Sequence, residues 1–169
     1  ISNSFAQNTI KEGVLIVAGG CFWCTESDFE KHKGVLHAES GYINGSTLNP
    51  TYKEVSSNQT GHFEAVKITY NKDLVTLRDL VDFYWYTIDP TDPNGQFCDK
   101  GSSYKTALFY QDEAQKAVFE DSLASIKLTK PFDDSIVTAI LKAKKFYSAE
   151  SYHQDFYKKC SMRYNYYLH

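Results

Sequence analysis

The sequence predicts a single α/β or α+β domain built around a mixed β-sheet, and three observations lead to this prediction. The chain has 169 residues, a length that suits one domain with a core of its own. Short apolar runs typical of strands alternate with segments of helical periodicity, an order that favours a sheet flanked by helices. No internal repeat, low-complexity tract or linker interrupts this order. We therefore expect a tail over residues 1–10 and one compact domain over residues 11–169.

Three strands and two helices are expected in the first half of the chain. Residues 14–18 are apolar and end in Gly19–Gly20, a pattern typical of a buried strand. Residues 21–32 carry acidic residues early and lysines late, the polarity of a helix aligned with its dipole. Apolar residues spaced i, i+3, i+4 and i+7 predict a helix over residues 77–84. Two further strands are predicted at residues 35–42 and 63–70.

The second half continues the alternation, and two long irregular segments stand out along the chain. Residues 44–60 and 89–103 are rich in Gly, Ser, Asn, Asp, Pro and Thr, which indicates loops or turns. Irregular stretches this long are uncommon in so small a domain and usually carry function. The regular elements are a strand at 106–110, a helix at 113–126, a strand at 136–141 and a short helix at 149–159. Together these elements predict an elaborated ferredoxin-like fold with long active-site loops.

Charge and composition exclude several classes of function. The formal net charge is −3, which argues against nucleic acid or an anionic membrane as the main partner. No apolar run approaches the roughly 20 residues of a membrane span. Four cysteines are too few for a disulfide scaffold, and they form one close pair with scattered histidines, so no metal site is expected. Ser4–Phe5–Ala6 has the small-x-small form of a signal-peptidase site, which leaves a cytoplasmic, periplasmic or secreted location open.

Cys21 has the surroundings of a reactive thiol. It follows a hydrophobic strand and two glycines and stands at the expected start of a helix, where backbone N–H groups and the helix dipole favour a thiolate. Cys24 lies three residues further on, on the same helical face, so the pair has the Cys-x-x-Cys spacing of thiol–disulfide exchange. Between them, Phe22 and Trp23 either enclose an apolar pocket for a substrate group or belong to the core.

Glu64 and three loop residues are further candidates. Glu64 shares a strand face with Val66 and Ile68, so partial desolvation would raise its pKa and make it a general acid, unless it reaches water at the strand end. Tyr52, Asp99 and Tyr104 lie in the two irregular segments, where such side chains also serve as capping groups. His62 and His153 are expected to be hydrogen-bonded structural histidines.

The motifs of this chain resemble those of the A-class peptide methionine sulfoxide reductases. Gly19-Gly20-Cys21-Phe22-Trp23-Cys24-Thr25-Glu26 resembles the nucleophile motif of that family. Further matches follow in family order and span nearly all of the chain: Gly41-Tyr42, Asn49-Pro50-Thr51-Tyr52, Gly61-His62-Phe63-Glu64-Ala65-Val66, Asp99-Lys100-Gly101-Ser102-Ser103-Tyr104, Ala149-Glu150, Tyr152-His153-Gln154-Asp155 and Tyr164.

The resemblance implies the reduction of methionine S-sulfoxide, free or in proteins, as a repair of oxidative damage. Cys21 would attack the sulfoxide sulfur and become a sulfenic acid, and Glu64 would protonate or hydrogen-bond the sulfoxide oxygen. The remaining roles implied are hydrogen bonds to that oxygen from Tyr52 and Tyr104, an organising role for Asp99, and substrate binding by Phe22, Trp23 and Tyr164. Thioredoxin is the implied reductant, no cofactor is needed, and a monomer is expected.

The resolving cysteine is where this sequence departs from the common family pattern. Many members have Lys-Asn-Pro before the tail tyrosine, whereas this chain has Lys159-Cys160-Ser161, and the glycine-rich tail with recycling cysteines is not present in it. Three candidates remain. Cys160 ranks first because the tail could swing towards the pocket, Cys24 ranks second as the nearest in sequence, and Cys98 lies beside Asp99.

Two other functions remain as alternatives at this stage. A general thiol–disulfide exchanger would use Cys21 and Cys24 and would not need Glu64. A structural or zinc-binding module would use the aromatic loops to bind peptides.

Overall fold

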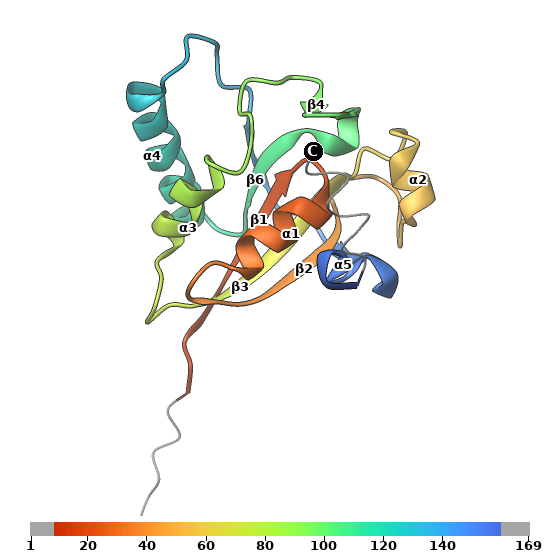
Figure 1. The fold of residues 1–169 in the computed structure, drawn as a ribbon, viewed down its shortest axis with the longest axis horizontal. Helices are drawn as coiled ribbons and strands as arrows, with labels where there is room; N and C mark the ends of the chain where they lie inside the picture. Colours follow the sequence, from red (N-terminus) through yellow and green to blue (C-terminus); the bar gives the residue numbers. More distant parts are fainter. Residues whose placement is uncertain (1–8, 160–169) are drawn as a thin grey trace, which may run out of the picture.

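The computed structural model describes residues 9–159, which surround a six-stranded mixed sheet (Figure 1). The strands lie in the order β7-β6-β1-β3-β2-β8. β6 pairs with β7 in parallel, and every other neighbouring pair in this sheet is antiparallel. The strands are β1 Glu12–Gly19, β2 Val35–Ile43, β3 Phe63–Asn71, β6 Thr106–Tyr110, β7 Ala139–Lys142 and β8 Phe146–Ser148.

The central four strands have the ferredoxin-like arrangement that the sequence predicts. Helix α1 (Phe22–Glu30) connects β1 to β2, and helix α3 (Leu77–Tyr84) connects β3 to β6. β3 lies between β1 and β2 and is antiparallel to both, so each strand–helix–strand unit is split by a strand from the other. Helix α4 (Glu113–Thr129) then returns the chain to β7 at the edge, and β8 extends the opposite edge. The predicted fold class is confirmed.

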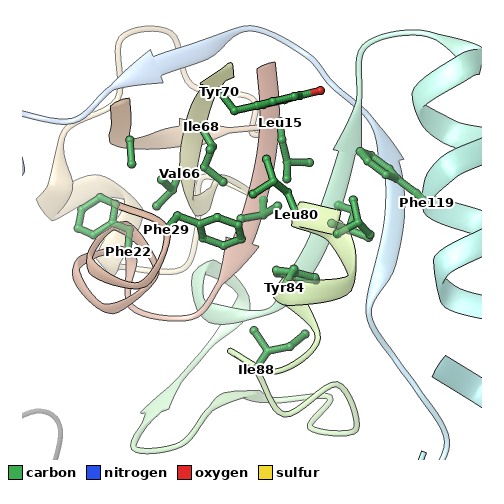
Figure 2. Packing of buried hydrophobic residues seen from close by; sticks show 14 of the residues in the cluster. Leu15, Phe22, Phe29, Val66, Ile68, Tyr70, Leu80, Tyr84, Ile88 and Phe119 are labelled. Atoms are coloured by element: carbon green, nitrogen blue, oxygen red, sulfur yellow. The ribbon is translucent and has the colours of Figure 1, made fainter. Parts of the chain in front are cut away.

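The main core lies between one face of the sheet and helices α1, α3 and α4. Alternate residues of β1 and β3 point to this face, and Leu15, Val66 and Ile68 are fully buried there. Phe29 of α1 and Leu80 of α3 pack against them (Figure 2). Each such buried side chain contributes roughly 1.5–3 kcal/mol. The other face carries a smaller cluster of Ile16, Ala18, Ile43, Ala65, Ala107 and Phe109.

Local chemistry explains where helices α3 and α2 begin. Thr76 caps α3 by accepting a hydrogen bond from the Asp79 N–H, while the Asp79 carboxylate accepts from the Thr76 N–H. Thr51 and Glu54 form the same capping box at a short helix, α2 (Tyr52–Ser56). In Figure 1, α2, β4 (Gly95–Gln96) and the start of α1 gather at the end of the sheet where β1 finishes.

The structure corrects the sequence prediction in the irregular segments and near the C-terminal end. Residues 44–60 contain α2, and residues 89–103 contain the hairpin of β4 with β5 (Asp99–Lys100). Strand 136–141 begins later, as β7, and β8 was not predicted because it is only three residues long. The predicted helix 149–159 is wrong over most of its length. The 3₁₀ turn η2 (Ser151–His153) and helix α5 (Phe156–Lys159) are separated by Asp155, whose φ of 54° breaks the helix.

Within residues 9–159, no helix is long and apolar enough to cross a bilayer. Residues 1–8 of the expected tail lie outside the described part of the chain.

Candidate active site

Cys21 occupies the N-cap of α1, between the end of β1 and the first helical turn. The preceding Gly20 has a φ of 86°, a conformation that favours glycine. A Cβ at that position would lie 2.6 Å from the Cβ of Gln96, so only glycine lets the two segments approach. Cys21 O accepts backbone hydrogen bonds from Cys24 and Thr25, which fixes the cysteine at the helix start.

A small cavity opens at Cys21 and gathers the residues that the sequence singled out. Its volume is about 130 Å³, enough for a small substrate group. It is lined by Cys21, Phe22, Trp23, Tyr52, Glu64, Asp99 and Tyr104. We call Glu64, Tyr52 and Tyr104 the polar wall, and Phe22 and Trp23 the aromatic wall. The two walls face the same cysteine from elements far apart in the sequence.

Glu64 is a buried carboxyl group at the start of β3. Its side chain lies on the helix-covered face of the sheet, and the residue is 2% exposed. The Phe22 N–H donates a hydrogen bond of 3.1 Å to Glu64 Oε2. Burial nevertheless dominates and raises the pKa of Glu64 to about 8. The expectation of a desolvated carboxyl is confirmed, and Glu64 can hold a proton at neutral pH.

Cys21 and Cys24 form a hydrogen-bonded thiol pair. Hydrogen bonding to Cys24, burial and the nearby Glu64 raise the pKa of Cys21 well above its ordinary value, whereas the Trp23 N–H lowers it. The same thiol–thiol hydrogen bond lowers the pKa of Cys24. The predicted lowering of the Cys21 pKa by the helix start is therefore wrong for the resting site. The Trp23 N–H lowers the pKa of Cys21 as expected, but the hydrogen bond with Cys24, burial and the Glu64 charge outweigh it.

The two tyrosines of the polar wall come from different loops that are tied together. Tyr52 begins α2, and Tyr104 ends the 3₁₀ turn η1 (Ser102–Tyr104). Asn58 Oδ1 accepts hydrogen bonds from the Ser103 N–H at 3.0 Å and from Ser103 Oγ at 2.9 Å, which joins the segments. Burial and the Glu64 charge raise the pKa of both tyrosines, so both hydroxyl groups remain protonated donors.

Comparison with known proteins places this arrangement in a family. Residues 13–169 match the family described as peptide methionine sulfoxide reductase. The chain belongs to this family. The peptide methionine sulfoxide reductase MsrA of Bacillus licheniformis is 48% identical over 157 residues, which are 93% of this chain and 87% of that protein.

Solved structures agree with the sequence comparison. Reduced Mxr1 from Saccharomyces cerevisiae superposes with a TM-score of 0.84 and 31% identity over 92% of both chains. Mxr1 in complex with Trx2 gives a TM-score of 0.61 and 23% identity over 92% of both chains, a likeness in fold.

Asp99 lies in β5 of this reductase, where the cavity meets a second, larger hollow. Burial raises the pKa of Asp99. A groove of about 480 Å³ borders Cys21, Cys24 and Asp99, and exposed Phe97 and Cys98 lie along it. Cys24 and Cys98 thus both lie close enough to the cavity to border the same groove as Cys21.

Two residues named from the sequence cannot be placed. Cys160 and Tyr164 lie outside the described residues, so both remain expectations. Across residues 9–159, no group of three or more His, Cys, Asp or Glu side chains is arranged to hold a metal ion.

Sequence reasoning missed the residues that support the cavity from behind. Glu150 accepts hydrogen bonds from Tyr42 Oη at 3.0 Å and from the Tyr52 N–H at 3.2 Å. Buried Glu26 accepts from the Asp155 N–H at 2.5 Å and from Ser40. The sequence offered one indication of this support. Glu26 follows the aromatic residues at the start of the expected helix, and a buried carboxylate needs a hydrogen-bond partner. Which segment supplies that partner depends on the tertiary fold.

Proposed function

We propose that Cys21 is the nucleophile with which this reductase reduces methionine S-sulfoxide, free or in a polypeptide, to methionine. The observation that carries the proposal is the placement of Cys21, buried Glu64 and two tyrosine hydroxyls around one small cavity. A sulfoxide has an electrophilic sulfur and a basic oxygen, so it needs a thiolate on one side and proton donors on the other. This cavity provides both.

The proton balance between Cys21 and Glu64 suits this reaction. In the resting site, burial and Glu64 oppose the thiolate. A proton on Glu64 removes that repulsion, and the raised pKa of Glu64 keeps the proton available near neutral pH. Glu64 then donates to the sulfoxide oxygen as the thiolate attacks the sulfur, and Tyr52 and Tyr104 stabilise the developing charge on oxygen. Methionine leaves, and Cys21 keeps the oxygen as a sulfenic acid.

The aromatic wall provides the apolar half of substrate recognition. Phe22 and Trp23 have ring centroids 6.3 Å apart and line the cavity beside Cys21. An S-methyl group against these rings would point the sulfoxide oxygen towards the polar wall, which selects one epimer at sulfur. Asp99, half-buried at the cavity rim, would organise the substrate backbone. Tyr164 remains a proposed substrate contact from sequence alone.

Cys24 is the proposed resolving cysteine. Its thiol already hydrogen-bonds with Cys21, and Cys21 holds the N-cap three residues earlier. The Cys24 thiolate would attack the sulfur of the Cys21 sulfenic acid, forming a disulfide and displacing hydroxide, which takes a proton from solvent and leaves as water. A thioredoxin dithiol would then reduce that disulfide, and yeast Mxr1 has been solved with such a partner, Trx2. Cys160 and Cys98 are the competing candidates.

A single-turnover experiment tests the nucleophile and the resolving cysteine together. The reduced protein is mixed with a methionine-sulfoxide peptide without reductant, and the products are mapped by mass spectrometry. We expect one methionine released per chain and a Cys21–Cys24 disulfide. Methionine release by Cys21→Ser at the wild-type rate would refute the nucleophile. A disulfide from Cys21 to Cys160 or Cys98 would refute the role of Cys24 and leave the nucleophile intact.

A second substrate, insulin, distinguishes the reductase from a general thiol–disulfide exchanger. Glu64→Gln should abolish most sulfoxide reduction, whereas disulfide exchange on insulin needs no proton donor to a sulfoxide oxygen. Unchanged sulfoxide reduction in Glu64→Gln, together with strong insulin reduction that depends on Cys24, would favour the exchanger over the reductase.

A further inference from the structure

Phe97 is a large apolar side chain that the core of the domain does not use. It lies at the tip of the hairpin formed by β4 and β5, beside Cys98, and it is 71% exposed. Among residues 9–159, neither of the two apolar clusters includes it. An exposed phenyl ring adds little to the hydrophobic stabilisation of a fold. The stability of the core therefore does not account for an aromatic residue here.

The backbone of Phe97 adds a second cost. Its φ is 49°, in the left-handed region that favours glycine. Among residues 9–159, the other non-glycine residues with a positive φ are all Asn or Asp, whose short polar side chains tolerate this conformation: Asn44, Asn49, Asn58 and Asp155. A two-residue hairpin turn with a positive φ at its first central position commonly has glycine there. The turn itself therefore does not favour phenylalanine either.

The hairpin that carries Phe97 is anchored next to Cys21. Gln96 is 1% exposed, and its Oε1 accepts a hydrogen bond from the Asp89 N–H while its Nε2 donates to Asp89 O, both at 2.7 Å. The Gln96 side chain also occupies the space beside Gly20, immediately before Cys21. Phe97 thus follows a buried and hydrogen-bonded residue, which fixes the base of the turn.

The groove along the hairpin continues from the cavity. Both hollows are bordered by Cys21 and Asp99, whereas Phe97 borders the groove alone. The cavity has a volume of about 130 Å³, which suits a sulfoxide group with its methyl, and the groove has about 480 Å³. A polypeptide whose sulfoxide fills the cavity leaves it at the rim. The groove is the hollow that shares that rim, so the neighbouring residues of the polypeptide reach it.

We propose that Phe97 forms an apolar subsite in this groove for the side chain next to methionine sulfoxide in a polypeptide substrate. The inference rests on the proposed function, since the sulfoxide in the cavity determines which part of the polypeptide reaches the groove. An apolar side chain against the ring removes apolar surface of both molecules from water. This contact gives a reason for keeping an exposed phenylalanine in a conformation that favours glycine.

The test compares three substrates with dithiothreitol as the reductant, so that no second protein takes part. They are N-acetylmethionine sulfoxide and the pentapeptides Gly-Gly-Met(O)-Gly-Gly and Gly-Leu-Met(O)-Leu-Gly. Wild type should have a kcat/KM about 10-fold higher for the leucine peptide than for the glycine peptide, mainly through KM, because part of a leucine side chain is buried. In Phe97→Gly this preference should fall to about twofold or less, with unchanged activity on N-acetylmethionine sulfoxide.

Stability separates this role from a structural one. Glycine suits a φ of 49°, so Phe97→Gly should leave the urea midpoint unchanged or raise it, although it weakens binding of the leucine peptide. Phe97→Asn also tolerates this backbone and should lose the leucine preference in the same way. Phe97→Tyr keeps the ring and should retain the preference to within about twofold.

The matched control removes an exposed apolar side chain that does not border the groove. Leu128 lies on α4 and is 88% exposed. Leu128→Ala should leave kcat/KM unchanged for all three substrates. Binding without turnover is measured by calorimetry of both pentapeptides on Cys21→Ser, with and without Phe97→Gly.

The outcomes separate the subsite from the other occupants of the groove and from the proposed function. Equal kcat/KM for both peptides in wild type, an undiminished preference in Phe97→Gly, or an equal loss on N-acetylmethionine sulfoxide would each overturn the inference. A defect of Phe97→Gly that appears only when thioredoxin replaces dithiothreitol would also overturn it, because the ring would then contact the reductant. If wild type reduces none of the substrates but binding of the leucine peptide to Cys21→Ser still depends on Phe97, the proposed function is overturned and the apolar subsite remains.

Discussion

The two walls of the cavity are built in different ways. In the polar wall, Glu64 belongs to a central strand, β3, and accepts a hydrogen bond from the first residue of α1. In the aromatic wall, Trp23 is the second residue of α1 and is held by His153 and Phe156, about 130 residues later in the chain. The polar wall is thus part of the sheet and its loops, and the aromatic wall depends on a docked segment near the C-terminal end.

This structural difference matches a difference in role: the polar wall takes part in the chemical step, and the aromatic wall determines which substrate binds. A proton donor must stay at a fixed place and depth, and the buried end of a central strand provides both. An apolar surface that binds a methyl group changes its shape when the residues packed behind it change. Changes in the polar wall should therefore lower the rate of the chemical step, and changes behind the aromatic wall should mainly alter substrate binding and preference.

The largest effect is expected from Glu64→Gln. The amide can hydrogen-bond the sulfoxide oxygen but cannot give it a proton, so kcat/KM should fall by about 10²–10⁴-fold, with kcat carrying most of the loss. Steady-state reduction of a methionine-sulfoxide peptide measures this. Glu12→Gln, on the exposed start of β1, is the matched control and should keep wild-type activity. A loss of less than threefold in kcat/KM for Glu64→Gln would show that Glu64 is not the proton donor.

The second prediction concerns the cost of burying Glu64. Its folded pKa of about 8 lies above its ordinary value of 4.5, so the folded protein binds the proton more tightly than the unfolded chain. The stability associated with that proton is complete below pH 4.5 and is lost as the pH rises through about 8. Between pH 5 and pH 9, wild type should lose on the order of 3 kcal/mol more than Glu64→Gln. Urea denaturation of both proteins at both pH values measures this difference. An equal change in the free energy of unfolding for wild type and Glu64→Gln would contradict the prediction.

The sequence could predict the place of Glu64 and the turn before Cys21 because both depend on short-range patterns, whereas the roles of Tyr52 and Tyr104 came from the family resemblance. Alternation along residues 63–70 placed Glu64 on the buried face, and Gly19–Gly20 before Cys21 indicated the strand-to-helix turn. The support of the aromatic wall could not be predicted in this way. Asp155 breaks the expected helix 149–159, and the partners of His153 and Gln154 lie on α1 and β2, which only the tertiary fold brings near. The pKa of Cys21 is raised first by Cys24, a neighbour on the same helix, and then by burial and Glu64, which only the tertiary fold supplies.

A smaller loss is expected from the tyrosines of the polar wall. Tyr52→Phe and Tyr104→Phe each remove one donor to the sulfoxide oxygen and should lower kcat/KM about 10–100-fold. Because both side chains line the same small cavity and would bind the same oxygen, the double variant should lose less than the product of the single losses. Tyr86→Phe, an exposed tyrosine beside the groove, serves as the control. Strictly multiplicative losses would mean that the two hydroxyls act independently.

The smallest effect should come from Phe156→Leu, which tests the aromatic wall through stacking alone. Leucine keeps the site apolar but loses the ring that lies 3.8 Å from the Trp23 ring, so KM should rise about twofold to threefold while kcat stays near wild type. The matched control is Phe83→Leu, which removes an edge-on contact with Phe29 at 5.2 Å on the far part of α1. Both variants should lose about 1 kcal/mol of stability, but only Phe156→Leu should change KM. If kcat fell instead of KM rising, the docked segment would act on the chemical step, and the division between the two walls would be wrong.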